Sequence, residues 1–325
     1  MERVHSAKEY LEYWKSAMAD IHWFKKRRLF DYNRDEMIED VTREFGSPGS
    51  IGLVVRSQES GEVLGVLGVT IRGNAGVFGR WEPAVRLKWR SGGAGEALVR
   101  EAFSWLRSKG VSRATCVLRV PHSLPRSGEW HKALYEGCGF ERVGLAGIML
   151  LADLRKANIP VQRVRDLRVV DGGFSLEDFA DFTRRAYLST PEDVAVHGKD
   201  PFVSILGENM RVLRAVKHGD YGSSAPECWK VAMLGEEVAG FIIGFLPKSE
   251  YRPSHGVIAE LGVFPEFRRK GIAHSLVVEM LECFRKYGCR YSYVGTPRSN
   301  EPAIRLYQKA GHEPVFQIVS FEKRL

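Results

Sequence analysis

Two short sequence patterns occur twice in this chain of 325 residues, in the same order and at nearly the same spacing. The first is a basic turn, R-x-x-G-x-G/A, at Arg90–Gly95 and, 178 residues later, at Arg268–Ala273. The second is L-Y-x-x-x-G, at Leu134–Gly139 and, 172 residues later, at Leu306–Gly311. Two ordered matches at nearly equal offsets predict an internal duplication, so the chain should fold as two copies of one domain.

The length of the chain fits such a duplication. Two domains of about 160 residues each are of ordinary size and can each bury an adequate core. We expect a linker near Lys156–Pro160, which gives a first domain of residues 1–157 and a second of residues 158–325. Strands that alternate with helices predict an α/β sandwich in each domain. The first copy has no obvious opening strand, so we expect its sheet to be one strand short.

The second basic turn has the features of a phosphate-binding site. The apolar segment Gly256–Phe264 predicts a strand before it, and apolar residues at helical spacing predict a helix over Gly271–Tyr287. A glycine at such a turn lets the backbone approach a ligand and leaves the first helical N–H groups unpaired. The helix dipole then favours an anion by about 0.3–1 kcal/mol. Arg268, Arg269 and Lys270 add positive charge.

Together the two patterns resemble those of the GNAT superfamily of acyl-CoA-dependent N-acetyltransferases. The residues that carry the resemblance are V-x-P followed by R-x-x-G-x-A, from Val263 to Ala273, and N-x-x-A-x-x-L-Y-x-K-x-G, which begins at Asn300. The resemblance is most specific over 256–312. It implies acetyl-CoA as cosubstrate and, in each domain, a mixed, mostly antiparallel sheet flanked by helices. The tandem arrangement is similar to that of mycothiol synthase. His312 departs from the family pattern, which usually has phenylalanine there, and should affect packing more than chemistry.

The resemblance also implies which residues bind the cofactor. The turn would grip the CoA pyrophosphate, and a backbone N–H around Val263 or Phe264 would stabilise the oxyanion. Asn300 would contact the pantetheine arm, although its place before Glu301-Pro302 also suits a helix N-cap. The predicted cofactor-binding residues are Val263, Phe264, Arg268, Arg269, Lys270, Gly271, Ile272, Ala273 and Asn300.

Two residues are candidates for the chemistry. Glu260 is the hypothesised general base, directly or through water, because several family members place a carboxylate on this strand at the cleft. Strand alternation puts it on one face with Ile258 and Gly262, and a structural ion pair with an arginine is the alternative. Tyr307 is the hypothesised general acid for the CoA thiolate, since the family helix carries a tyrosine near the thioester sulfur. Its alternative is a core aromatic on a helical face.

The first copy of the turn is a candidate second cofactor site, but its surroundings are eroded. Arg90, Gly92, Gly93 and Gly95 could still wrap a phosphate. However, Gly128 stands at the position that matches Asn300, and a glycine also replaces the lysine of the later helix. We therefore expect the second copy to be catalytic. The first copy is either a degenerate scaffold or a silent CoA site.

Charge and composition exclude several other classes of protein. The net charge of +8 invites a nucleic-acid interpretation, but the cations are scattered and no nucleic-acid-binding motif accompanies the densest cluster, Lys25–Arg28. Met1–Tyr13 is charged, and the longest apolar run, Val238–Leu246, is too short to span a bilayer. Five cysteines show no metal-ligand spacing. We expect a cytoplasmic protein without membrane, nucleic-acid or metal partners.

These patterns predict an N-acetyltransferase that moves an acetyl group from acetyl-CoA to an amine within a ternary complex. The acceptor, a small-molecule amine or a peptide N-terminus or lysine, would bind between Leu176–Ala186, Pro201–Val216 and the closing strands. The lining expected there includes Tyr187, His197 and Asp200. His255 and His274 are not expected to be catalysts, since nothing local orients their rings. The alternatives are an acyl-CoA-sensing module without turnover and, third, a peptide- or nucleic-acid-binding scaffold.

Overall fold

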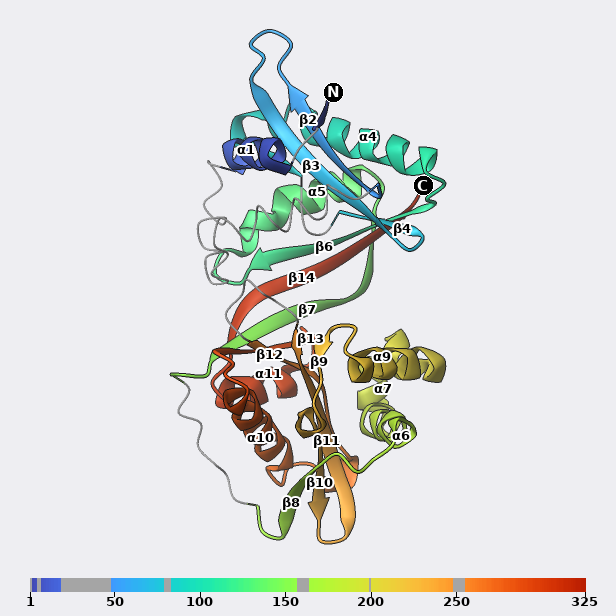
Figure 1. Cartoon of the computed structure of the whole chain (residues 1–325), viewed down its shortest axis with the longest axis vertical. Helices are drawn as coiled ribbons and strands as arrows, with labels where there is room; N and C mark the ends of the chain where they lie inside the picture. The colour runs from blue at the N-terminus through green and yellow to red at the C-terminus, as the bar shows by residue number, and fades with distance from the viewer. Residues whose placement is uncertain are drawn as a thin grey trace. The chain divides into compact units, whose positions relative to one another are not determined.

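A computed structural model of the chain describes residues 2–4, 7–18, 48–78, 83–156, 164–198, 200–247 and 255–325 (Figure 1). The basic cluster Lys25–Arg28 and most of the predicted linker lie outside these residues. The chain divides into two compact units: unit 1 comprises Met1–Val143 with Phe316–Leu325, and unit 2 comprises Gly144–Val315. The predicted domains, 1–157 and 158–325, follow the sequence repeat and stay a prediction. The compact units differ from them because each unit takes its last strand from the other half of the chain.

Unit 2 is built on a mixed sheet in the order β8-β10-β11-β12-β13-β7. Neighbouring strands are antiparallel except β12 and β13, which are parallel. The strands are β8 (Leu167–Asp171), β10 (Trp229–Leu234), β11 (Glu237–Pro247), β12 (His255–Val263), β13 (Tyr291–Pro297) and the second part of β7 (Glu141–Asp153). The short β9 (Gly222–Ser223) pairs with β11.

Helices cover both faces of the unit 2 sheet (Figure 1). On one face lie α6 (Leu176–Tyr187), α7 (Pro191–His197), α8 (Pro201–Ser204) and α9 (Leu206–His218), and on the other lie α10 (Ile272–Lys286) and α11 (Glu301–Lys309). Short 3-10 turns precede β10 at η4 (Pro226–Cys228) and follow β12 at η5 (Pro265–Phe267). The helix starts obey local rules: Ser175 and Asp178 form a capping box before α6, and Thr190 caps α7. Aromatic side chains fill the core between the layers, with Trp229, Phe241 and Phe284 fully buried.

The sheet of unit 2 opens where β12 and β13 separate. Their parallel pairing extends only from His255 and Tyr291 to Ile258 and Val294. Beyond that point β12 continues alongside β11, with a register shift at Ala259 that is a β-bulge. The bulge interrupts the alternation on which the predicted orientation of Glu260 rested. The diverging strands leave room for a ligand between them.

Unit 1 repeats this plan, in the order β1-β2-β3-β4-β6-β14 with β4 and β6 parallel. Its strands are β1 (Glu2–Val4), β2 (Ser50–Arg56), β3 (Val63–Arg72), β4 (Ala75–Val77), β5 (Ala84–Val85), which pairs with β3, β6 (Arg113–Pro121) and β14 (Glu313–Arg324). The expectation of a missing opening strand is wrong, because the three-residue β1 pairs with β2. The shared order of strands confirms two copies of one α/β fold.

The helices among the described residues of unit 1 are α1 (Ala7–Met18), α4 (Ala94–Ser108) and α5 (Glu129–Gly137), with short 3-10 turns η2 (Leu87–Trp89) and η3 (Pro125–Gly128). Helix α4 follows the first basic turn, as α10 follows the second basic turn. Among the helices of the described residues, in either unit, none is long and apolar enough to cross a membrane.

Candidate functional site

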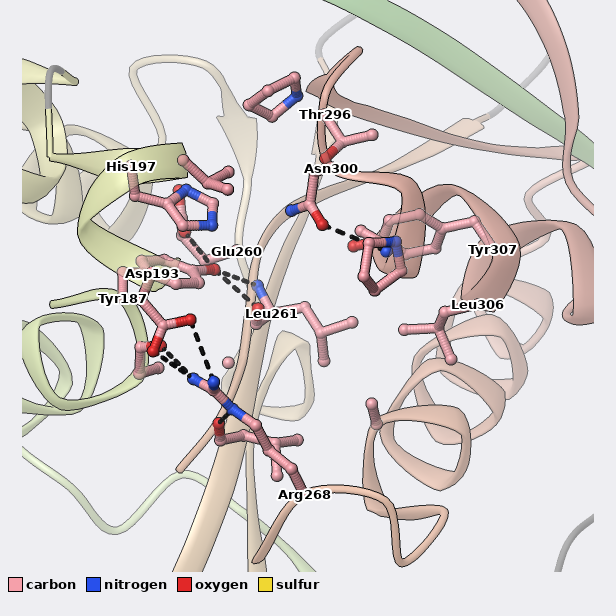
Figure 2. A pocket seen from close by; sticks show the side chains of 18 of the residues that line it. Tyr187, Asp193, His197, Glu260, Leu261, Arg268, Thr296, Asn300, Leu306 and Tyr307 are labelled. Atoms are coloured by element: carbon pink, nitrogen blue, oxygen red, sulfur yellow. Dashed lines mark hydrogen bonds and ion pairs between the residues drawn. The ribbon is translucent and has the colours of Figure 1, made fainter. Parts of the chain in front are cut away.

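A cavity of about 880 Å³ lies in unit 2 at the opening between β12 and β13 (Figure 2). Its walls come from the end of α6, from α7 and α8, from β12 and the turn after it, from the end of β13, and from α11. Glu260 and Tyr307 line it together with most of the predicted cofactor residues: Val263, Arg268, Arg269, Gly271, Ile272, Ala273 and Asn300. Two predicted residues do not line it. Phe264 is fully buried in the core, and the Lys270 ammonium lies over the ring of Phe267, 5.2 Å from its centre.

The Arg268 guanidinium is already engaged within the protein (Figure 2). It makes a bidentate ion pair with Asp193, with Nη1 donating to Oδ1 at 3.0 Å and Nη2 donating to Oδ2 at 2.9 Å. Nε donates to the Val263 carbonyl at 3.0 Å, and Nη2 donates to the Ala186 carbonyl at 2.7 Å. Arg268 thus ties the turn to β12 and to α6 and α7, and Asp193 compensates its charge. A direct phosphate contact from this side chain stays a prediction.

The backbone of the turn presents N–H groups to the cavity. Arg269 and Gly271 both have left-handed backbone angles, with φ of 63° and 87°. Gly271 is the N-cap of α10 and supplies no side-chain cap, so the first N–H groups of the helix keep no such partner. Alternating backbone conformations of this kind turn successive N–H groups toward one point, which suits an anion. A left-handed non-glycine residue such as Arg269 is uncommon, and such residues cluster at functional sites.

Glu260 meets a tyrosine hydroxyl rather than a cation. The Tyr187 Oη lies 3.0 Å from the Glu260 carboxylate and 2.7 Å from the Leu261 carbonyl, so its one proton can be donated to either acceptor. The Leu261 N–H donates to Tyr187 Oη at 3.3 Å. Burial raises the pKa of Glu260 to about 8; the hydrogen bond from Tyr187 opposes the rise, and the negative charge of Asp200 adds to it. The alternative role for Glu260 was a structural ion pair with an arginine. Within the described part of the chain no lysine or arginine forms an ion pair with Glu260.

Tyr307 reaches the same cavity from α11. It is 5% exposed, and its hydroxyl hydrogen-bonds to none of the described residues. Burial, with a contribution from the negative charge of Glu260, raises its pKa, so the hydroxyl keeps its proton at neutral pH. The His312 ring packs edge-on against Tyr307, with ring centres 5.7 Å apart. Burial lowers the pKa of His312 to about 4, so this departure from the family pattern places a neutral ring there.

One backbone N–H near the end of β12 is directed into the opening. The Phe264 N–H donates to the Ala239 carbonyl at 3.0 Å and is therefore committed to the sheet. Antiparallel neighbours alternate between pairs that exchange hydrogen bonds and pairs that do not. Phe264 and Ala239 form a hydrogen-bonded pair, so the next pair, Val263 and Gly240, is one that exchanges no hydrogen bonds. The Val263 N–H therefore points away from β11. Of the two predicted oxyanion donors, only Val263 is oriented toward the cavity.

The wall opposite α11 holds the residues expected to meet the acceptor. The Tyr187 and His197 rings stack with centres 4.5 Å apart and an angle of 27°. Burial lowers the pKa of His197, so the stacked imidazole is neutral at pH 7. Asp200 lines the same wall, and its Oδ1 accepts the Phe202 N–H at 3.0 Å at the start of α8. The structure thus brings the predicted acceptor residues to one side of the cavity with Glu260.

Sequence reasoning missed two of the lining residues and dismissed a third. His274 is 3% exposed, yet neither ring nitrogen hydrogen-bonds to a described residue. Burial, with a contribution from Lys309, lowers its pKa, so the ring is a neutral donor and acceptor beside the turn. Its position three residues after the turn glycine was the available signal. Glu192 and Asp193 left no local signal, because they reach the cavity only through the fold.

Asn300 caps α11 as expected, its Oδ1 accepting the Ala303 N–H at 3.3 Å.

The first basic turn repeats the geometry of the second. Arg90 Nε donates to the Val85 carbonyl at 3.2 Å, as Arg268 donates to Val263. Gly93 is the left-handed N-cap of α4, with φ of 76°. These contacts are 178 residues apart in the chain and confirm that the duplication extends to the turn.

The space beside the first turn is filled by a tryptophan. The Arg90 guanidinium lies over the Trp130 ring at 4.6 Å from its centre, and Trp130 Nε1 donates to the Arg90 carbonyl at 3.4 Å. A Cβ atom on Gly95 would be 3.0 Å from the same indole. The Gly92 N–H donates to the Trp89 carbonyl at 3.1 Å. Trp130 therefore packs directly against the first turn, and cofactor binding there stays a prediction.

Comparisons with known sequences agree on one family. The model of the acetyltransferase (GNAT) family matches residues 15–140 and 201–312, one match in each half of the chain. An acetyltransferase of Photorhabdus laumondii is 34% identical over 101 residues, which cover 31% of this chain and 67% of that protein. The N-alpha-acetyltransferase 30 of Xenopus laevis is 33% identical over 86 residues, covering 26% of this chain and 32% of that protein.

Solved structures share the fold at low sequence identity. A tandem GNAT protein from the clavulanic acid biosynthesis pathway has a TM-score of 0.52 and 18% identity, and the match covers 99% of this chain and 97% of that one. A GCN5-related N-acetyltransferase from Sphaerobacter thermophilus has a TM-score of 0.56 and 17% identity, with 88% and 85% covered. Because the first of these matches spans both chains almost completely, it confirms the tandem arrangement.

Proposed function

The chain belongs to the acetyltransferase (GNAT) family in its tandem form, and on that premise we propose that unit 2 transfers an acetyl group from acetyl-CoA to an amine in a ternary complex. One observation carries the proposal. The cavity holds a carboxylate without a cationic partner among the described residues, Glu260, and the hydroxyl of a lining residue, Tyr307, that has no hydrogen-bond partner among them. A proton acceptor and a proton donor in one cavity are what amine acylation by a thioester requires.

The cofactor side of the cavity suits acetyl-CoA. A cavity of about 880 Å³ is within the range of roughly 300–1,000 Å³ usual for small-molecule sites. The backbone N–H groups of the turn would hold the pyrophosphate, with Arg269 adding charge. The unpaired ring nitrogens of His274 would hydrogen-bond to the cofactor, and Asn300 would lie along its arm while it caps α11. Acetyl-CoA supplies an acetyl group activated as a thioester.

Glu260 and Tyr307 would share the two proton transfers. An amine arrives as an ammonium ion and must lose a proton, which the ionised Glu260 accepts directly or through water. The hydrogen bond from Tyr187 helps to hold this carboxylate in its ionised form. The Tyr307 hydroxyl, kept protonated by its raised pKa, donates a proton to the departing sulfur. After attack on the thioester the nitrogen loses its second proton to Glu260 as well. One of the two protons returns from Glu260 to Tyr307 through the cavity, the other is released to solvent, and the Val263 N–H would stabilise the negative oxygen of the tetrahedral intermediate.

We propose a structural role for unit 1. Its turn keeps the left-handed glycine and the arginine-to-strand contact of the cofactor site, but Trp130 covers it. This arrangement supports the scaffold interpretation of the first copy over a silent CoA site. Acetyl transfer would then depend on the cavity of unit 2 alone.

The decisive experiment combines a calorimetric titration with acetyl-CoA and an assay of CoA release with a panel of amines. We expect one cofactor site per chain and CoA release that depends on the amine. Glu260→Gln should lower kcat by about 10²–10⁴-fold while the Kd for acetyl-CoA stays unchanged. Glu279→Gln, an exposed glutamate on α10 outside the cavity, is the matched control. Binding of acetyl-CoA without release in the presence of any amine would instead favour the acyl-CoA-sensing module.

A further inference from the structure

Resting on the proposed function, we infer that the acceptor is an alkylamine that carries a second cationic group, with the reacting amine at Glu260 and the second cation at Asp200. The two carboxylates lie on the wall formed by β12 and by the segment between α7 and α8. The inference names the class of acceptor and not the acyl donor.

The charges of the cavity are segregated. The described residues that line the acceptor side include four carboxylates and neither lysine nor arginine: Glu192, Asp193, Asp200 and Glu260. The cations that line the cavity belong to the turn before α10 or to α11, on the cofactor side: Arg268, Arg269, Arg305 and Lys309. A cofactor with several phosphates matches the second group, and a cationic acceptor matches the first.

The negative charges of two of these carboxylates are not balanced by a positively charged side chain among the described residues. Asp193 is neutralised by Arg268 at 2.9 Å. Glu260 receives a hydrogen bond from the neutral Tyr187, and Asp200 receives one from the backbone of Phe202. Neither of these two carboxylates forms an ion pair within the described residues, and the negative charge of Asp200 opposes ionisation of Glu260. Bringing a cation between them would relieve this repulsion.

A second observation points to a ligand in the same cavity. The Tyr307 side chain is 95% buried by the protein, yet its hydroxyl hydrogen-bonds to none of the described residues. The residue lines the cavity, so the hydroxyl is open to a bound molecule and can form with it the hydrogen bond that the protein does not supply. The reacting centre of the acceptor should therefore lie between Tyr307 and Glu260.

The surface around the two carboxylates suits an alkyl chain. Phe202 and Val203 contribute apolar side chains to the lining. The Tyr187 and His197 stack adds two aromatic faces, and His197 adds no positive charge because burial lowers its pKa. Methylene groups can pack on these surfaces, and an ammonium group gains from a nearby aromatic face. An acceptor with a carboxylate would find no lysine or arginine on this side among the described residues.

Asp200 has a structural role from which its charge can be separated. Its Oδ1 caps the start of α8 by accepting the Phe202 N–H. Asparagine caps helices as well as aspartate does, so Asp200→Asn keeps the cap and removes the charge. Asp181→Asn is the matched control, since Asp181 is exposed on α6 and lies outside the cavity lining.

The test compares three acceptors of similar length, 1,4-diaminobutane, 1-aminobutane and 4-aminobutanoate, at pH 8 with saturating acetyl-CoA. We expect kcat/KM for the diamine to exceed that for the monoamine by about 10- to 100-fold, as for one charge-assisted contact, with 4-aminobutanoate the poorest. Asp200→Asn should remove most of this advantage by lowering kcat/KM for the diamine far more than for the monoamine, and should leave the Kd for acetyl-CoA unchanged. Asp181→Asn should behave as the unsubstituted protein.

Equal kcat/KM for the diamine and the monoamine would overturn the inference, as would a preference for 4-aminobutanoate. An equal loss for both amines in Asp200→Asn would also overturn it, because Asp200 would then act only as a cap. Preference for a peptide whose sole cation is its N-terminal ammonium would do the same. In each of these cases CoA is released and the proposed function stands. Absence of release with every amine would instead overturn the proposed function, and the acceptor class with it.

Discussion

The rate of acetyl transfer should rise with pH as Glu260 ionises. Only the ionised carboxylate can accept the proton of an incoming ammonium ion, and burial raises the pKa of this carboxyl to about 8. With that pKa, about one molecule in a hundred has Glu260 ionised at pH 6, about one in ten at pH 7 and about half at pH 8. We therefore expect kcat/KM for the acceptor, which reports the enzyme before the acceptor binds, to rise about tenfold from pH 6 to 7, about fivefold from pH 7 to 8, and little above pH 9.

The assay is the initial rate of CoA release from pH 5.5 to 9.5, with acetyl-CoA saturating and the acceptor well below its KM. The acceptor also loses a proton, so two acceptors whose own amine pKa values differ by about two are needed. If the rising limb of the plot of rate against pH is due to Glu260, its midpoint lies at the same pH with both acceptors. If the limb is due to the acceptor amine, its midpoint moves with the pKa of that amine. Asp200→Asn should shift the limb toward lower pH, because the charge that helps to raise the pKa of Glu260 is removed.

Two results would refute this reasoning. The first is a limb near pH 4–5, the ordinary range of an exposed glutamate, which would show that burial does not perturb the group. The second is the same limb, at the same pH, in Glu260→Gln. In the second case another group titrates, and Glu260 is not the base.

Further predictions concern stability and binding. Because the folded-state pKa of Glu260 is raised, the folded protein favours the protonated carboxyl and loses stability as the pH rises from about 4.5 to 8; Glu260→Gln should therefore raise Tm relative to the unsubstituted protein at pH 9 but not at pH 5. Gly271→Ala must adopt φ of 87° at a cost of about 1–2 kcal/mol, and we expect calorimetry to show a Kd for acetyl-CoA raised about tenfold, with an unchanged Kd contradicting the cradle. Asp193→Asn leaves the half-buried Arg268 guanidinium without its counter-charge and should cost about 1–3 kcal/mol in denaturant unfolding, a loss that Arg268→Lys shares if the bidentate geometry matters. Acetyl-CoA titration should give one site per chain in the unsubstituted protein, whereas two sites there would show that the indole of Trp130 does not close the first turn.

The local features of the fold could be predicted from the sequence. The turn glycine, the helix that follows it and the Asn300 cap each depend on a few consecutive residues, and the structure reproduces them. The duplication could be predicted because two patterns recur at nearly one offset. The predicted strand alternation at Glu260 failed for a physical reason, since the β-bulge at Ala259 inserts one residue and no local pattern marked it.

The contacts that shape the site depend on the fold and left no pattern in the sequence. The ion pair of Arg268 joins it to Asp193, 75 residues away in the chain. The hydroxyl that contacts Glu260 belongs to Tyr187, 73 residues away. Cationic and polar side chains of this kind have several candidate partners, and only the packing of α6 and α7 against β12 selects one. His274 was not expected to take part because no neighbour in the sequence orients its ring. Its burial without a hydrogen-bond partner among the described residues arises only in the assembled cavity, so the sequence could not reveal it.

The strand exchange between the two halves has a consequence for how the protein is made. Unit 1 completes its sheet with Phe316–Arg324, so Arg113 contacts Glu322 across 209 residues of chain. Contacts of such sequence separation form late and slow folding. During synthesis β6 would wait as an unpaired edge until residues 316–325 have left the ribosome, and such edges invite aggregation. A fragment limited to residues 158–325 would lack the β7 strand that covers β13. The two units are therefore expected to fold as one cooperative system, in which neither half of the gene encodes an independent domain.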